Sequence, residues 1–155
     1  MQVFLKNLLP TLEIFITSLV VAYIGQLLDK QIGLSNFSSS VVIIGGAILL
    51  LLGILIRIWA TVAFSRSRVK VLQLSAPETL VQNGPYAYSR NPLYVGIFLM
   101  VSGVAVIFGS ISMAVFSVAL LIFADWWIKN KEEPSLLKKF GEPYRHYLRT
   151  TRRWM

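Results

Sequence analysis

Four long apolar stretches constrain this chain more than any other feature of its sequence. They cover residues 8–28, 41–64, 92–108 and 111–128. A helix needs roughly 20 mostly apolar residues to cross the hydrocarbon core of a bilayer. Charged residues make up 14% of the 155 residues, whereas an ordinary soluble domain has about 25%. The sequence therefore predicts an all-α integral membrane bundle of four transmembrane helices, folded as a single membrane domain over residues 1–155.

The connections between these stretches predict how the helices are arranged. Gly109 and Ser110 alone separate the third stretch from the fourth, so we expect these two spans to form a tight hairpin. In the second stretch, Gly46 and Gly53 share a helix face, and small residues let membrane helices approach closely. The tail, residues 129–155, alternates apolar and basic positions at helical spacing. We expect it to form short amphipathic helices on the membrane surface.

The distribution of Lys and Arg predicts the orientation in the membrane. Four spans place both termini, the 65–91 loop and the 129–155 tail on one side. That side carries most of the basic residues, and the other side keeps only Lys30. Basic residues favour the cytoplasm, so we expect a multi-pass protein with both termini cytoplasmic, in a bacterial or archaeal inner membrane. We expect the first span to be retained rather than cleaved as a signal peptide.

Composition excludes several classes of function. The net charge is +8, but the basic residues flank apolar spans, as orientation signals and contacts with anionic lipids do. We therefore expect a membrane surface as the partner and no nucleic acid. The chain has no cysteine, and His146 is its single histidine. Thiolate nucleophiles, disulfides and histidine-rich metal sites are excluded, and we expect no metal.

The first polar cluster lies where the third span begins. Gly84 and Pro85 indicate a turn, and Asn91 before Pro92 is a favourable N-cap with proline at the first helical position. The unpaired N–H groups of such a helix end suit a carboxylate or a phosphate. The same residues are also what any helix start requires.

The second cluster is the acid pair Glu132 and Glu133, at the exit of the fourth span. Adjacent acids there oppose both the helix dipole and the basic bias of that side. A hairpin returns the chain to its starting side, so the pair should lie near Asn91 and Tyr94. This convergence is the strongest indication of a site, although Lys129 and Lys131 could equally make the acids a solvated charge cluster.

Together these motifs resemble a known family. Gly84-Pro85-Tyr86, Arg90-Asn91-Pro92-x-Tyr94-x-Gly96, the acid pair, Phe140-Gly141-Glu142-x-Tyr144-x-x-Tyr147 and Arg152-Arg153-Trp154 occur in order over roughly residues 45–155. The pattern is similar to that of the integral membrane methyltransferases, which comprise isoprenylcysteine carboxyl methyltransferases and phospholipid N-methyltransferases.

The resemblance implies S-adenosylmethionine as cofactor and a lipophilic membrane substrate, with the tail closing over the site. The positions it implies for cofactor binding are Leu80, Val81, Tyr86, Asn91, Pro92, Tyr94, Glu132 and Glu133. Carboxylates can accept from ribose hydroxyls or an amino group, and tyrosines combine an apolar wall with a polar tip. We expect catalytic roles for Glu133, Tyr94 and Arg90.

Two departures from the family bear on the substrate. The carboxyl methyltransferases usually have histidine at the position of Asn91 and arginine at the position of Ile128. Both differences favour an amine or phospholipid acceptor without deciding it. Arg57 and Lys129 are candidates to bind the substrate headgroup, with Arg66, Arg68 and Arg90 as further basic candidates.

Two other classes remain open from the sequence. Four spans and Glu13 in the first of them are compatible with a small proton-coupled exporter, because acids within membrane spans are often functional. The long basic loop and tail argue against it. A lipid reductase with a membrane core like that of the sterol reductases is the other alternative.

Overall fold

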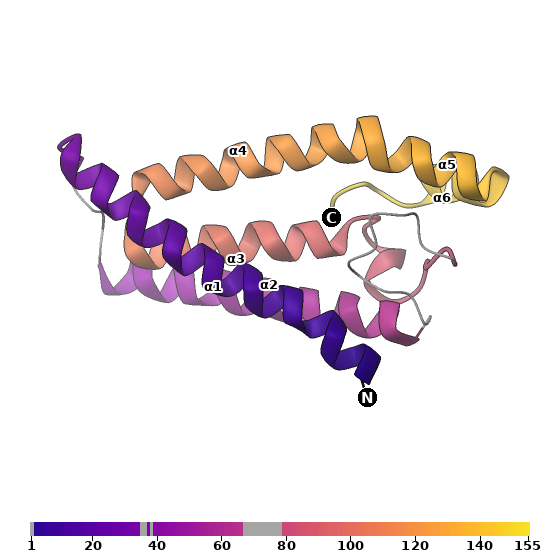
Figure 1. The fold of residues 1–155 in the computed structure, drawn as a ribbon, viewed down its shortest axis with the longest axis horizontal. Helices are drawn as coiled ribbons and strands as arrows, with labels where there is room; N and C mark the ends of the chain where they lie inside the picture. The colour runs from indigo at the N-terminus through magenta and orange to yellow at the C-terminus, as the bar shows by residue number, and fades with distance from the viewer. Residues whose placement is uncertain (1, 35–36, 38, 67–78) are drawn as a thin grey trace.

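Long apolar sequences form long helices here, and four of them lie side by side. The computed structural model describes residues 2–34, 37, 39–66 and 79–155, with the backbone alone for residues 2–8 and 66. Its four long helices are α1 (Gln2–Gln31), α2 (Ser40–Arg66), α3 (Pro92–Phe108) and α4 (Ile111–Trp127). They run alternately in opposite directions, so the N-terminus, the start of α3 and the exit of α4 share one end of the bundle (Figure 1). We call this the site end and the opposite one the turn end.

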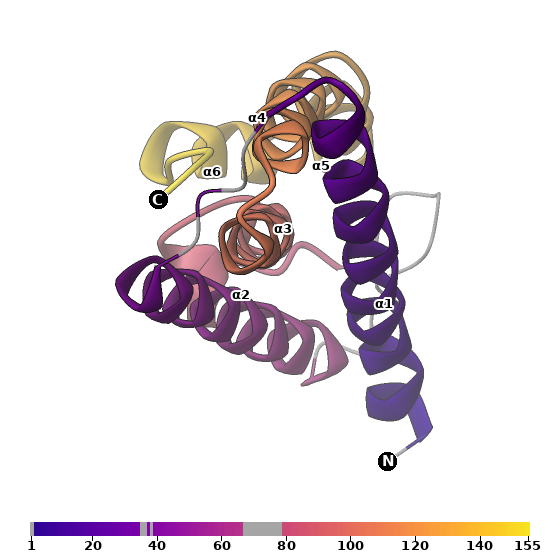
Figure 2. The same cartoon turned by 90° about the vertical axis from the view of Figure 1, so that its left-hand side faces the viewer.

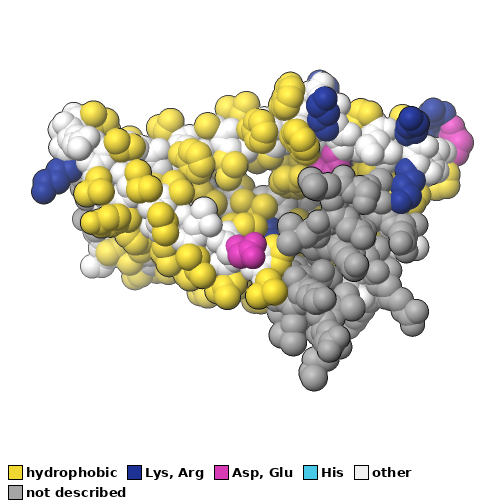
Figure 3. All heavy atoms as spheres, viewed as in Figure 1, with side chains coloured by type: hydrophobic (Ala, Val, Ile, Leu, Met, Phe, Trp, Pro, Cys, Tyr) yellow, Lys and Arg dark blue, Asp and Glu magenta, His cyan; other side chains and the backbone are white. Residues whose placement is uncertain are grey.

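Among the described residues, three helical segments are long and apolar enough to cross a membrane. They are Leu9–Gln31, Ser40–Ser65 and the continuous run Ile111–Phe140, whereas Pro92–Phe108 is a shorter apolar helix. On the face that Figure 3 shows, hydrophobic side chains cover most of the described surface of the helices, and most of the visible Lys and Arg lie toward the two ends. An apolar exterior of this kind is suited to lipid rather than water. The expected all-helical membrane protein is confirmed at this level.

Helix α3 is the central element, in contact with the other three long helices (Figure 2). Its closest neighbour is α2, and glycines allow the approach. A Cβ at Gly53 would lie 2.7 Å from the backbone nitrogen of Met100, and one at Gly103 would lie 2.5 Å from that of Leu50. The predicted contact face of α2 with Gly46 and Gly53 is confirmed. Backbones this close need small residues on both helices.

At the turn end, a buried carboxylate joins α1 to α4. Gly109, with φ +60°, ends α3, and Ser110 caps α4 by accepting from the backbone N–H of Met113. The carboxylate of Asp29 is 1% exposed. Its Oδ2 accepts from Ser110 Oγ at 2.7 Å, and its Oδ1 accepts from the backbone N–H of Ser112 at 3.0 Å. A carboxylate at a helix N-terminus is favoured by the helix dipole.

At the site end, the chain continues from α4 into shorter helices. A π-helical segment, η2 (Ile128–Glu132), leads into α5 (Glu133–Phe140), and Gly141 with φ +60° separates α5 from α6 (Glu142–Thr150). This reversal brings residues 152–154 back to the start of α3 (Figure 1). The two predicted tail helices are therefore present. Before α3, the 3-10 turn η1 (Gly84–Ala87) packs beside α2.

Candidate active site

The start of α3 is shaped by a short polar loop rather than by a side-chain cap. Asn91 occupies the N-cap position and Pro92 follows it, as predicted. The Asn91 side chain makes no capping bond, and its Nδ2 donates to the carbonyl of Arg153 at 3.2 Å. Its backbone N–H donates to Ser89 Oγ at 3.1 Å. Asn91 therefore holds the predicted N-cap position, and its side-chain amide links the start of α3 to the tail.

The acid pair lies next to this loop, so the convergence predicted from the sequence is confirmed. Tyr94 Oη donates to Glu132 Oε2 at 3.1 Å, which joins the first turn of α3 to η2. The hydrogen-bond partner of Glu132 is thus a neutral hydroxyl. A π-helical turn often occurs at a functional site because it changes the register of the side chains that follow.

Glu133 has different surroundings from its neighbour. Arg90 Nη2 donates to Glu133 Oε1 at 2.9 Å. Arg153 binds both oxygens, with Nε at 3.0 Å from Oε1 and Nη2 at 2.9 Å from Oε2. Paired guanidinium–carboxylate bonds of this geometry are among the stronger hydrogen bonds in proteins. These bonds raise the pKa of Arg153 above its usual range. Within the described ranges, Glu133 is thus an ion-paired carboxylate, and Glu132 is not.

Tyr86 lies beneath this network with an unpaired hydroxyl. Its side chain is 5% exposed and packs against Val81 and against Phe64, whose ring centroid lies 5.0 Å away. Burial raises the pKa of Tyr86 well above its usual range, with Tyr147 and Glu132 adding to the effect and Arg57 opposing it. Within the described part of the chain, Tyr86 Oη and Arg90 Nε are buried without a hydrogen-bond partner. Such groups normally find one.

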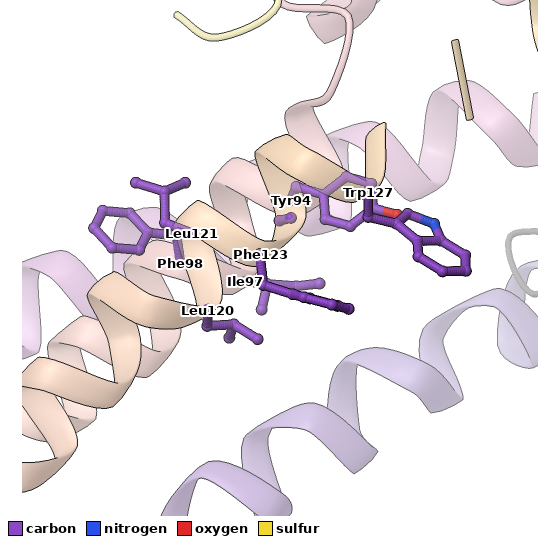
Figure 4. A pocket seen from close by; sticks show the side chains of 8 residues that line it. Tyr94, Ile97, Phe98, Leu120, Leu121, Phe123 and Trp127 are labelled. Carbon is purple, nitrogen blue, oxygen red and sulfur yellow. The ribbon is translucent and has the colours of Figure 1, made fainter. Parts of the chain in front are cut away.

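An apolar cavity of about 360 Å³ lies between α3 and α4 and ends at Tyr94 (Figure 4). Phe98 and Leu121 lie together at one end, and Tyr94 and Trp127 lie at the other. Phe123 and Trp127 are large exposed hydrophobic side chains, so the cavity opens on the outer face of the helices. Its lining residues are Tyr94, Ile97, Phe98, Leu120, Leu121, Phe123, Ala124 and Trp127.

The remaining predicted residues are more dispersed. Leu80 is half-buried and Pro92 is buried, both near the loop before α3. Lys129 is exposed on η2. Arg57 is 2% exposed, and it donates from Nε to Thr11 Oγ1 at 3.2 Å and from Nη1 to the Leu93 carbonyl at 3.2 Å. Arg68 and the side chain of Arg66 lie outside the described residues.

Sequence reasoning missed how the end of the chain contributes to the site. Arg153 Nη1 donates to Asp125 Oδ1 at 3.3 Å, and Trp154 Nε1 donates to the same oxygen at 2.9 Å. The backbone N–H of Arg90 donates to the Arg152 carbonyl at 2.9 Å. Arg153 and Trp154 belong to the recognised motif, and that was the one available signal. Their partners are set by the reversal at Gly141, which the sequence does not specify.

Comparison with known proteins agrees with this arrangement. The sequence profile of the phospholipid methyltransferase family matches residues 41–143, a segment that includes η1, α3, α4 and the acid pair. The chain therefore belongs to the phospholipid methyltransferase family. It is also 34% identical over 84 residues to the protein-S-isoprenylcysteine O-methyltransferase of Schizosaccharomyces pombe.

That second match is partial. It covers 54% of this chain and 35% of the yeast protein. Because the relative is eukaryotic, it gives no support to the expected bacterial or archaeal membrane. Neither the exporter nor the sterol-reductase alternative is favoured by these comparisons. Glu13, on which the exporter rested, lies exposed on α1.

Proposed function

We propose that this protein is an S-adenosylmethionine-dependent methyltransferase that acts on a lipophilic substrate at the cytosolic face of a membrane. One observation carries the proposal: the Glu132–Tyr94 pair lies at the end of an apolar cavity between the apolar helices α3 and α4. A polar methyl donor and a lipophilic acceptor must meet where a polar group borders an apolar cavity. Family membership supports the same reaction class.

The polar groups fit the proposed cofactor in charge and in hydrogen bonding. S-adenosylmethionine supplies a methyl group on a positively charged sulfonium, and it carries an ammonium group and ribose hydroxyls. Glu132 is a carboxylate that accepts a hydrogen bond from the neutral hydroxyl of Tyr94, so its charge suits a cationic ligand. Tyr86 Oη and Arg90 Nε are buried and unpaired in the described structure. They offer further hydrogen bonds to a bound molecule.

Each site residue then has a physical role. Tyr94 orients the Glu132 carboxylate through its hydroxyl. Val81 and Tyr86, with Leu80 nearby, form an apolar wall that excludes water. Methyl transfer is an in-line displacement, so holding the reactants in line and away from water supplies most of the catalysis. An amine acceptor must also lose a proton, and the Glu132 carboxylate is the candidate to receive it, directly or through the Tyr94 hydroxyl that donates to it.

The cavity suits the hydrocarbon part of the substrate, which would enter sideways from the bilayer. Its lining is apolar except at Tyr94, so the reacting headgroup would lie at that end. Ile128 is 1% exposed and uncharged, which leaves no cation at this position for a carboxylate acceptor. Asn91 and Ile128 together favour an amine headgroup. Lys129 and Arg57 remain proposed headgroup residues, and of the two Lys129 is the exposed one.

The topology belongs to the same proposal. We propose that α3, although shorter, spans the membrane with α4 as a hairpin, giving four spans with both termini in the cytosol. A helix of 17 residues is about 25 Å long at 1.5 Å per residue, close to the hydrocarbon thickness of ~30 Å. The cavity between the two helices would then face the acyl chains, and the site would open to the cytosolic water that contains the cofactor.

Incubation of the purified protein with isotopically labelled S-adenosylmethionine and membrane lipids tests this function. Mass spectrometry of the lipids should show label on a phospholipid amine headgroup, and a parallel reaction with an isoprenylcysteine substrate tests the carboxylate alternative. Glu132→Ala should abolish most of the transfer. Glu142→Gln is a matched control, because Glu142 is an exposed acid on α6. Folded protein that labels neither substrate would contradict the proposal.

A further inference from the structure

The ion pairs of Glu133 indicate that Glu132 and Glu133 have different roles. Four charged side chains form one cluster at the site end: Arg90 and Arg153 are cationic, and Glu133 and Asp125 are anionic. Their ion pairs lie at 2.9–3.3 Å, and the charges balance within the cluster. Glu133 therefore has no charge left to offer a ligand. Among the residues that the structure describes, Glu132 is bonded to a neutral tyrosine and carries the unbalanced charge.

Arg153 is the residue that assembles this cluster. Its guanidinium fork binds both oxygens of Glu133 and reaches Asp125 with the remaining nitrogen. Its backbone carbonyl accepts from Asn91 Nδ2 at 3.2 Å and from Ser89 Oγ at 3.1 Å. One residue thus contacts α4, the start of α5 and the loop before α3. Arginine suits this position because a lysine has no planar fork to bind two oxygens at once.

We propose that Arg153 is a positioning residue: it holds Glu133 and the loop before α3 in place so that Glu132 and Tyr94 face the cofactor. The inference rests on the proposed methyltransferase function and deepens it. Arg153 itself does not need to touch the cofactor or the substrate. Truncation of its side chain would release Glu133 from one of its two arginines and break the ion pair with Asp125. The backbone carbonyls of residues 152 and 153, which bond the 89–91 loop, would then lose the side-chain anchor that holds them in place.

The test compares Arg153→Ala, Arg153→Lys and Arg149→Ala in the purified full-length protein. Arg149 is exposed on α6, so its variant makes the same change of charge nearby. We expect Arg153→Ala to raise the KM for S-adenosylmethionine at least about tenfold and to lower kcat less than threefold, per amount of folded protein. Arg153→Lys should recover part of the loss because it restores the charge without the fork. Arg149→Ala should match the wild type.

A second readout needs no cofactor. The backbone N–H of Arg90 is bonded to the Arg152 carbonyl, so hydrogen exchange in the 89–94 segment reports whether the tail holds the loop. Exchange should accelerate at least about tenfold in Arg153→Ala and stay unchanged in Arg149→Ala. Unchanged exchange, or a KM in Arg153→Ala equal to that of Arg149→Ala, would overturn the positioning role. Accelerated exchange in a protein that binds no S-adenosylmethionine would instead overturn the proposed function.

Discussion

The two ends of the bundle use carboxylates in opposite ways. At the turn end, Asp29 is bonded through both oxygens to the first turn of α4, and it joins two helices that are distant in sequence. At the site end, Glu133 is fully paired, while Glu132, Tyr86 Oη and Arg90 Nε keep unused hydrogen-bonding capacity. A carboxylate whose bonds are complete stabilises a joint. Unused polar groups in a buried place indicate a site that a ligand completes.

This difference implies that the residues that stabilise the bundle are not the residues that bind a ligand. Changes at the turn end should alter the stability of the bundle and leave ligand binding as it is. Changes at the unpaired groups of the site end should alter binding with little or no loss of stability. Any variant that violates this division weakens the interpretation of the site end as a ligand site.

The largest effect on stability should come from Asp29→Ala. The substitution leaves the Ser110 hydroxyl and the Ser112 N–H without their acceptor at a buried helix start. We expect the melting temperature in detergent to fall by about 5 °C or more. Affinity for S-adenosylmethionine, measured at a temperature where the variant is folded, should equal that of the wild type. Loss of binding in folded Asp29→Ala would show that the two ends are not independent.

A smaller effect should follow from Tyr86→Phe, which should weaken ligand binding without lowering stability. The hydroxyl has no partner in the described structure, and an unpaired buried polar group costs about 1–3 kcal/mol. Removing it should leave the melting temperature unchanged or raise it, while affinity for S-adenosylmethionine falls about threefold to tenfold. Calorimetry and thermal unfolding on the same sample measure both. A drop in stability with unchanged affinity would mean that the hydroxyl has a structural role.

The smallest effect concerns alkaline pH, which should act on the site end alone. Burial raises the pKa of Tyr144 to about 12 and raises the pKa of Tyr147 above its usual range. Above a pH of about 10, the unfolded chain releases tyrosine protons that the folded protein retains. Stability should therefore fall as pH rises beyond that point.

Thermal unfolding at pH 9 and pH 11 measures this fall. Tyr144→Phe should reduce it, because the variant has no phenol proton to lose at that position. Tyr88→Phe serves as the control, since Tyr88 is 68% exposed. An equal fall in the wild type and in Tyr144→Phe would show that other groups set the alkaline limit.

The sequence predicted the elements and the meeting of the two polar clusters, because both follow from simple constraints. Apolar runs fix the helices to within a few residues at most ends, and a two-residue connection at Gly109 must return the chain to its starting side. Small residues predicted the contact face of α2. Each of these signals is local or follows from topology.

The details of the site could not be read in the same way. The bond from Asn91 to the Arg153 carbonyl and the fork of Arg153 on Glu133 join residues 62 and 20 positions apart. They depend on the reversal at Gly141 and on the π-helical turn η2, neither of which has a periodic signature in sequence. The sequence did not predict the role of Asp29 for the same reason, because its partners Ser110 and Ser112 come from the start of another helix.

Titration of S-adenosylmethionine into the detergent-solubilised protein tests the central claim most directly. We expect the wild type and Glu142→Gln to bind at micromolar concentration, and Glu132→Ala to bind at least about tenfold more weakly, which is about 1.4 kcal/mol. All three proteins should have similar melting temperatures without ligand. Equal affinity of Glu132→Ala and the wild type, or no binding by the folded wild type, would contradict the assignment of this polar cluster as the methyl-donor site.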